Sequence, residues 1–145
     1  MKEAVIFEAM EPRKEYLDAI NRLLPQLSAT AAPMDLDCLQ RLTADGNVHL
    51  LLATIDNNIA GMCTLATYMA PTGRKAWIED VVVDSEFRGM RLGRQLIERA
   101  IAEARKNTPC TLMLTSRPSR VAANALYKVT GFDSKETNVY KMTFR

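Results

Sequence analysis

The apolar positions along this chain recur with two different periods, and the change of period divides the chain into predicted helices and strands. Residues 16–27 repeat apolar side chains every three or four positions, which predicts an amphipathic helix that Pro25 ends or kinks. A second, short helix follows a loop at 28–33, with Asp35 as its N-cap and Gly46 near its end.

Alternating or β-branched apolar runs predict the strands. These runs lie at 4–8, 49–55, 59–67, 76–83, 111–115 and 138–144. Asp56, Asn57 and Asn58 form the turn of a hairpin between the second and third runs, because Asp and Asn tolerate a positive φ. Apolar residues at helical spacing predict two more helices, over 92–104 and 119–129, and Gly131 ends the second of these.

The resulting order of elements is β-α-α-β-β-β-α-β-α-β, with antiparallel hairpins first and a strand–helix–strand crossover afterwards. This order predicts an α+β fold, in which a mixed, mostly antiparallel central sheet carries helices on both faces. The length of 145 residues, without an internal repeat or a linker, predicts a single domain over residues 1–145.

The composition is that of a soluble globular protein, with 48% hydrophobic and 25% charged residues. A net charge of +2 is too small to indicate a nucleic-acid partner, and no apolar run approaches the ~20 residues that a membrane span needs. Cys38, Cys63 and Cys110 are dispersed, which predicts reduced thiols and a cytoplasmic location. With these thiols and a single histidine, His49, we expect no metal site.

The segment after the β-branched run at 81–83 has the character of a phosphate-binding turn. Residues 88–94, Arg-Gly-Met-Arg-Leu-Gly-Arg, lie between that predicted strand and a helix start, where unpaired N–H groups and the helix dipole favour anions. The Walker pattern is absent, and the dinucleotide fingerprint lacks its third glycine. The acyl-CoA pattern Arg/Gln-x-x-Gly-x-Gly/Ala is matched at Arg88 and Gly93, but Arg91 stands where glycine is usual.

This loop and several further motifs together resemble those of the GNAT superfamily of acyl-CoA-dependent N-acyltransferases. The similarity covers almost the whole chain. Residues 77–83, Trp-Ile-Glu-Asp-Val-Val-Val, resemble the fourth strand of that family. Residues 124–132, with Leu-Tyr-x-x-x-Gly-Phe, resemble a helix end of the family, and 138–140 resemble its last strand. The resemblance implies transfer of an acetyl group from acetyl-CoA to a primary amine, by direct attack in a ternary complex.

The resemblance also assigns the cofactor-binding residues. The backbone of Val81, Val82 and Val83 would pair with the pantetheine arm and polarise the thioester carbonyl, although these valines also serve the core. The pyrophosphate would rest on Arg88, Gly89, Met90, Arg91, Leu92, Gly93 and Arg94. For Arg91 we expect an unstrained helical φ and altered loop packing without loss of the cofactor. Asn124 would take over a cofactor contact, because Arg120 stands where many relatives carry asparagine.

Two residues are the candidates for proton transfer. Tyr127 matches the family tyrosine that protonates the leaving thiolate; the alternative is a tyrosine that packs its helix against the sheet. Glu79 best matches the acid that accepts the proton of the amine, directly or through water, and the alternative is a structural or substrate-orienting carboxylate. Simple alternation places Trp77, Glu79, Val81 and Val83 on one face, but relatives carry a bulge here, so the choice between Glu79 and Asp80 stays open.

The acceptor is the least defined part of the sequence. We expect the amine of a small molecule; a protein lysine or N-terminal amine, and a non-catalytic acyl-CoA-binding module, remain as alternatives. Asp35, Asp37 and Glu79 favour a cationic amine over an acidic one. The apolar C-terminal run at 138–144 is compatible with a homodimer.

Overall fold

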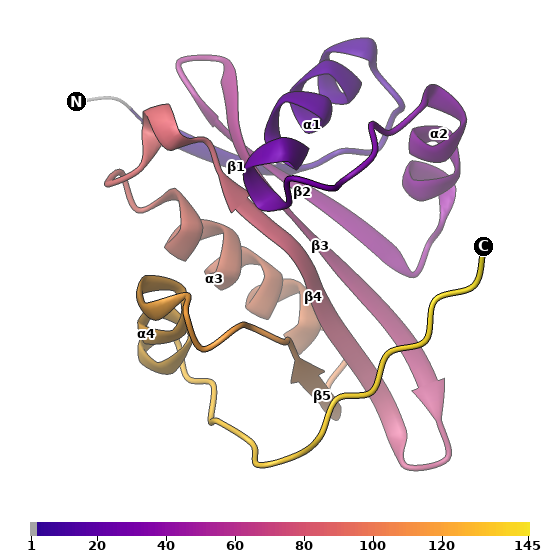
Figure 1. The fold of residues 1–145 in the computed structure, drawn as a ribbon. Helices are drawn as coiled ribbons and strands as arrows, with labels where there is room; N and C mark the ends of the chain where they lie inside the picture. Colours follow the sequence, from indigo (N-terminus) through magenta and orange to yellow (C-terminus); the bar gives the residue numbers. More distant parts are fainter. Residues whose placement is uncertain (1–2) are drawn as a thin grey trace. The chain divides into compact units, whose positions relative to one another are not determined.

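The structure is a computed structural model that describes residues 3–145. The chain forms two compact units, the first extending to Thr115 and the second running from Ser116 to Arg145. The first unit contains the whole sheet and three of the helices, and the second contains one helix (Figure 1). The two units are described separately below.

The first unit is built on a five-stranded sheet in the order β1-β2-β3-β4-β5. The strands are β1 (Ala4–Glu8), β2 (Val48–Ile55), β3 (Asn58–Ala70), β4 (Gly73–Val83) and β5 (Cys110–Met113). The first four strands pair in an antiparallel manner, whereas β5 runs parallel to β4. The mixed, mostly antiparallel sheet expected from the sequence is therefore confirmed.

Both tight hairpins follow from local residue chemistry. Asp56 and Asn57 have φ of +49° and +66°, which is the pattern of a type I′ turn and matches the right-handed twist of the strands. Gly73 begins β4 with φ of +120°, a conformation that glycine adopts without strain. Both β3 and β4 extend closer to this second hairpin than the sequence pattern predicts, since the ladder continues to the pair Ala70–Gly73.

Helices cover both faces of the sheet (Figure 1). On one face, α1 (Lys14–Leu27) and α2 (Leu36–Ala44) pack over a core that contains Leu50, Leu52, Met62 and Val82. Pro25 lies inside α1 and does not end it. Asp35 caps α2 as predicted, because its Oδ1 accepts a hydrogen bond from the Cys38 amide at 2.8 Å.

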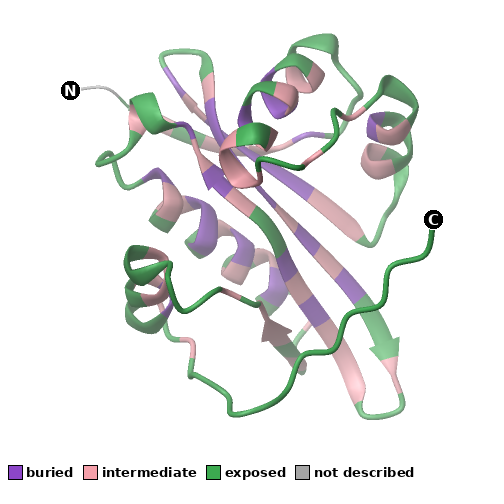
Figure 2. Cartoon of the chain, viewed as in Figure 1, coloured by how far each residue is buried: buried purple, intermediate pink, exposed green. Residues whose placement is uncertain are grey.

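On the opposite face, α3 (Leu92–Arg105) buries a stripe that includes Leu92, Leu96, Ile97 and Ala100, each no more than 1% exposed. Figure 2 shows this buried stripe on the inner side of α3 and the buried centres of the strands. Burial of such a stripe is the main source of stability for a helix on a sheet.

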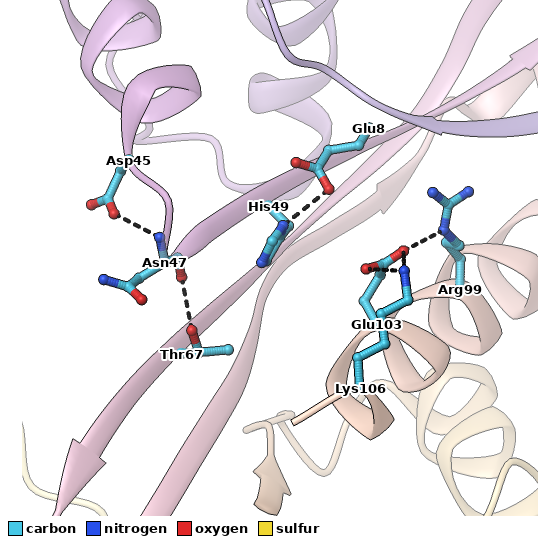
Figure 3. A network of polar contacts seen from close by, with 8 residues as sticks. All are labelled: Glu8, Asp45, Asn47, His49, Thr67, Arg99, Glu103 and Lys106. Atoms are coloured by element: carbon cyan, nitrogen blue, oxygen red, sulfur yellow. Dashed lines mark hydrogen bonds and ion pairs between the residues drawn. The ribbon is translucent and has the colours of Figure 1, made fainter. Parts of the chain in front are cut away.

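Polar contacts fix the C-terminal half of α3 to the edge strand β1 (Figure 3). The Arg99 guanidinium donates to the Ile6 carbonyl at 3.1 Å and to Glu103 Oε1 at 3.1 Å, and Lys106 completes an ion pair with Glu103 at 3.0 Å. Burial works against ionisation of Glu103, but Lys106 and Arg99 outweigh it and lower the pKa of this carboxyl. His49 and Glu8 form a separate pair at 2.9 Å between β2 and β1.

The second unit holds α4 (Val121–Val129), which ends at Thr130 and Gly131, the latter with φ of +113°. The strand predicted over 138–144 is wrong, because the structure has no strand there. Its apolar side chains are exposed, Val139 at 72% and Tyr140 at 88%, and Figure 2 shows the whole C-terminal segment as exposed. Alternation makes a segment suitable for a sheet, but a strand forms only when its backbone pairs, and this unit contains no strand to pair with.

Candidate active site

A bulge in the middle of β4 determines which carboxylate lies on the face of the sheet that α1 and α2 cover. Met62 lies opposite Val82, and Thr64 lies opposite Glu79, so that Cys63 alone on β3 faces two residues on β4. Asp80, one of these two residues, has φ of +53°. A bulge has one extra residue on one strand, and here that strand accommodates it with a left-handed residue, a conformation that aspartate tolerates better than most residues.

The bulge changes the alternation of side chains along β4. Val82 belongs to the core beneath α1 and α2, together with its partner Met62. Directly opposed residues point to the same face, and side chains alternate along the unbroken β3, so Thr64 and its partner Glu79 share that face. Without the bulge, Glu79 and Val82 would point to opposite faces.

The face of Glu79 is therefore settled by the register. Trp77 lies opposite Ala66 and shares this face with Glu79. Val83 lies opposite Gly61 and turns to the face that α3 covers, where a Cβ on Gly61 would meet Leu96 at 3.2 Å. The single face expected from simple alternation thus applies to Trp77 and Glu79 but not to Val83.

Glu79 has the electrostatic environment of a candidate base. Its side chain is largely exposed. The part of it that is shielded from water raises the pKa of Glu79 above its ordinary value of 4.5, and the negative charge of the neighbouring Asp80 raises this pKa further. A carboxylate with a raised pKa accepts a proton more readily than an ordinary glutamate.

The edge of β4 that faces β5 is only partly paired with another strand. The two strands pair over Arg74–Trp77 and Cys110–Met113, and β5 ends there while β4 continues to Val83. Among the described residues, 78–83 of β4 therefore have no strand partner on the β5 side. Such an edge offers backbone N–H and C=O groups to an extended ligand.

The loop that follows β4 leads from this edge to the start of α3. It consists of a short 3-10 turn, η1 (Ser85–Phe87), followed by residues 88–91. Gly89 has φ of +84°, with open space around its Cα, so its conformation and not crowding calls for glycine. Leu92 is 1% exposed and anchors the far end of the loop in the core, so that only its backbone amide is available to a ligand.

The N-terminus of α3 has no cap of its own. The first helical hydrogen bond runs from the Gln95 amide to the Arg91 carbonyl at 3.1 Å, which leaves the amides of Leu92, Gly93 and Arg94 without a partner inside the helix. The first turn contains no acidic residue, and no side chain caps it. Helix starts of this kind favour an anionic ligand.

The expectation of an unstrained helical φ at Arg91 is wrong. Arg91 is the residue that precedes α3 and has φ of +61° and ψ of +21°, in the left-handed region. The chain must turn sharply there between Gly89 and the buried Leu92, which explains why glycine suits this position. An L-residue in this conformation costs about 1–2 kcal/mol.

The arginines of this segment differ in whether they form an ion pair. Arg94 forms an ion pair along the helix with Glu98 at 2.7 Å, so its charge is already partly compensated. Arg88 and Arg91 are exposed, and neither forms a salt bridge with another described residue. Their guanidinium groups are the more available ones for a phosphate.

The other two predicted site residues lie on α4, in the second unit. Tyr127 is 7% exposed and makes an edge-to-face contact with Phe132, with ring centroids 6.0 Å apart. Asn124 donates through Nδ2 to the Arg117 carbonyl at 3.0 Å, and thereby closes the turn before α4. Arg120, the residue before the helix, provides no side-chain cap.

Sequence reasoning missed Asp84, the residue directly after β4. It is one of two buried polar residues among those described, and its carboxylate accepts hydrogen bonds from both α1 and η1. A carboxylate immediately after a β-branched run was the only available signal, and it also fits an ordinary turn residue.

Comparison with known proteins gives a consistent result. The model of the acetyltransferase (GNAT) family matches residues 14–132. A [ribosomal protein bS18]-alanine N-acetyltransferase of Escherichia coli (strain K12) is 39% identical over 59 residues, a stretch that covers 41% of this chain and 40% of that relative. The matched stretch thus spans about two fifths of the length of the curated relatives.

Solved structures share the fold at low sequence identity. Glucosamine-6-phosphate N-acetyltransferase from Arabidopsis thaliana has a TM-score of 0.80 at 21% identity, covering 97% of this chain and 98% of that one. An aminoglycoside acetyltransferase from an uncultured soil metagenomic sample, in complex with sisomicin, has a TM-score of 0.81 at 18% identity, covering 98% and 96%.

Neither a membrane-spanning helix nor a cluster of metal ligands occurs in the described part of the chain. Over residues 3–145, no helix combines the length and the apolar character needed to cross a membrane. The same part of the chain contains no group of three or more His, Cys, Asp or Glu side chains placed to hold a metal ion.

Proposed function

The chain belongs to the acetyltransferase (GNAT) family, and from this premise we propose that it transfers the acetyl group of acetyl-CoA to the primary amine of a small molecule. The observation that carries the proposal is the bulge at Asp80. It places a carboxylate with a raised pKa beside a free strand edge that leads to an uncapped helix start.

The loop and the start of α3 would bind the diphosphate of the cofactor. The amides of Leu92, Gly93 and Arg94 supply donors without helical partners, and Arg88 and Arg91 supply exposed positive charge. The helix dipole contributes only about 0.3–1 kcal/mol to such binding, so most of the affinity must come from these hydrogen bonds and guanidinium groups.

The free edge of β4 would bind the pantetheine arm as an added strand. A backbone amide of Val81 or Val82 would then donate to the thioester carbonyl as it becomes tetrahedral. A donor of this kind is worth about 10²–10³ in rate. The amide is supplied by the backbone, so the valine side chains remain free to fill the core.

Glu79 would act as the general base. At pH 7 only about one alkylamine molecule in a thousand is neutral, because its pKa is near 10.4. As the amine nitrogen attacks the carbonyl carbon, a C–N bond forms, and the proton of the amine passes to Glu79 directly or through water. The C–S bond then breaks, and the leaving thiolate takes a proton.

Tyr127 would supply that proton to the thiolate. A positioned acid contributes about 10²–10⁴ in rate. The contact between Tyr127 and Phe132 equally supports the alternative, in which the tyrosine is a packing residue of its own unit. The two roles differ in whether the hydroxyl matters, which a change to phenylalanine tests.

The face that carries Glu79 also favours a cationic acceptor. Trp77 lies on this face two residues before Glu79, and its indole N–H donates to the Tyr68 hydroxyl at 3.2 Å. Tyr68 is 49% exposed. An alkylammonium group would be attracted both by the carboxylate and by these aromatic faces.

The second candidate acceptor is the N-terminal amine of a protein. Its support is the 59-residue similarity to an enzyme named for acetylating an alanine of ribosomal protein bS18. A homodimer and a cytosolic location stay predictions from the sequence.

The test is a panel assay with acetyl-CoA that follows the release of free thiol. The panel holds aliphatic polyamines, arylalkylamines, amino sugars and short peptides with an N-terminal alanine. Catalysed release with small amines and none with peptides supports the proposal. Release with peptides alone favours the second candidate, and binding of coenzyme A without release from any amine favours a non-catalytic module.

A further inference from the structure

A buried carboxylate lies at the point where β4 passes into the cofactor loop. The Asp84 side chain is only 7% exposed. Its Oδ1 accepts a hydrogen bond from the Glu86 amide at 3.1 Å, and its Oδ2 accepts from Arg22 Nε at 3.4 Å. Its backbone is also held, since its amide donates to the Ala60 carbonyl at 2.7 Å and its carbonyl accepts from the Phe87 amide at 2.9 Å.

The side-chain partners of this junction come from α1, which packs on the face of the sheet that carries Glu79. Arg22 reaches Asp84 with Nε and the Ile59 carbonyl with Nη2, so it bridges β3 and the end of β4. Gln26, one helical turn later, accepts a hydrogen bond from the Ser85 amide through Oε1 at 2.8 Å. Two neighbouring side chains of α1 therefore hold Asp84, the residue before the loop, and Ser85, the first residue of the loop.

The charge of Asp84 is compensated by these contacts. The hydrogen bond from the Glu86 amide, with Gln26 and Arg22, outweighs burial and lowers the pKa of Asp84 below its ordinary value of 3.8. Removal of one partner of a buried charge is costly, because the other is left without compensation. The Arg22 side chain is half exposed along a groove of about 550 Å³, so the contact is reachable by solvent.

The loop is thus fixed at two ends by different means. At one end Asp84 is held by hydrogen bonds, and at the other Leu92 is held by apolar burial. Between them lie the two residues with positive φ, Gly89 and Arg91. The direction of the loop amides depends on both ends, and only the Asp84 end is connected to α1.

We propose that Asp84 and Arg22 are positioning residues for the cofactor loop, and that their contact couples helix α1, on the face of the sheet that carries Glu79, to the binding of the diphosphate. This inference rests on the proposed function, since it assumes that the loop binds acetyl-CoA. It predicts a specific kinetic signature. Loss of the contact weakens cofactor binding but leaves the chemical step intact, because neither residue touches the reacting atoms.

The experiment is a double-mutant cycle with Asp84→Asn, Arg22→Gln and the double variant. Asparagine keeps an acceptor for the Glu86 amide but loses the charge that Arg22 meets. Coenzyme A affinity is measured by calorimetry, and the kcat and KM for acetyl-CoA are measured with an amine found in the panel assay. Arg41→Gln is the matched control, since Arg41 forms an exposed ion pair with Asp37 on α2.

Each single variant should raise the Kd for coenzyme A and the KM for acetyl-CoA about five- to tenfold, with kcat within twofold of the wild type. The double variant should bind coenzyme A no more weakly than Arg22→Gln alone, because Arg22→Gln already removes the contact with Asp84 as well as the contact with the Ile59 carbonyl. Arg41→Gln should change nothing. If Asp84→Asn does not fold, Arg22→Gln alone tests the inference, since the Arg22 side chain is half exposed.

Three results overturn the inference: unchanged affinity in folded variants, a fall in kcat without a change in affinity, or fully additive effects in the double variant. Failure of the proposed function looks different. That failure is seen in the wild type itself, which then either does not bind coenzyme A or binds it without releasing thiol with any amine of the panel, whereas failure of this inference is seen only in the comparison of the variants with the wild type.

Discussion

Glu79 and Val82 lie three residues apart on β4 and point to the same face of the sheet, because the bulge at Asp80 inserts one residue between their partners. Val82 packs into the core beneath α1 and α2, whereas Glu79 on the same face is an exposed carboxylate. One backbone irregularity thus brings the candidate base onto the same face of the sheet as the core beneath α1 and α2. A bulge also bends the strand and leaves its edge less regular, which suits a site where a ligand must approach the backbone.

The first prediction concerns the carboxylate itself. Glu79→Gln should lower kcat by about 10²-fold or more, because a general base contributes 10²–10⁴ in rate. The side chain is exposed, so the free energy of unfolding and the affinity for coenzyme A should stay at wild-type values. Steady-state kinetics and calorimetry on the same preparation check this, and an unchanged kcat would assign Glu79 a structural or orienting role.

The second prediction concerns the influence of Asp80 on Glu79. The negative charge of Asp80 contributes to the raised pKa of Glu79, so Asp80→Asn should lower that pKa. The base then stays ionised to lower pH, and the acidic limb of kcat at saturating amine should move to lower pH. Asparagine tolerates positive φ as aspartate does, so the bulge should survive the change.

The control for this pH profile is Asp18→Asn, which removes an exposed carboxylate on α1. It should leave the acidic limb in place. A limb that does not move in Asp80→Asn, or that moves equally in both variants, would contradict the assignment of the limb to Glu79.

The third prediction concerns the strained turn before α3. Arg91→Gly should increase the free energy of unfolding by about 0.5–1 kcal/mol, since it removes a left-handed penalty of about 1–2 kcal/mol and glycine gives back about 0.5–1 through the entropy of the unfolded chain. Arg91→Ala is the control that removes the same guanidinium but keeps the strain. Urea unfolding distinguishes them, and an Arg91→Gly variant that is less stable than Arg91→Ala by about 0.5–1 kcal/mol would show that φ at this position is not costly.

The fourth prediction separates the two roles of Tyr127. Tyr127→Phe should lower kcat strongly and leave the Kd for acetyl-CoA unchanged, because the ring and its contact with Phe132 are retained while the proton donor is lost. Tyr140→Phe, at an 88% exposed position, serves as the control. Full turnover in Tyr127→Phe would leave only the packing role.

Much of the fold follows from local chemistry that the sequence makes explicit. Asp35 is predicted to cap α2 and does so, and Asp56 and Asn57 are predicted to form a hairpin turn and do so. These features depend on one or two residues and their own backbone, so the residue types suffice. The helices and the central strands follow equally well from the period of their apolar positions.

The features that the sequence does not reveal depend on partners distant in the chain. The strand predicted at 138–144 has the alternation of a strand but no strand to pair with in its unit. The left-handed conformation of Arg91 depends on where Leu92 is buried, and the role of Asp84 depends on Arg22, which is 62 residues away. The bulge leaves the face of Glu79 undecided until the register with β3 is known.

The central claim is that the amides at the start of α3 bind the diphosphate of acetyl-CoA and align the thioester with the free edge of β4. A crystal structure of the protein grown with coenzyme A tests it most directly. The account predicts diphosphate oxygens within about 3.2 Å of amides in the segment 88–94 and a pantetheine arm along 78–83 of β4. A diphosphate bound elsewhere, or a loop occupied by the Arg91 guanidinium, would contradict it.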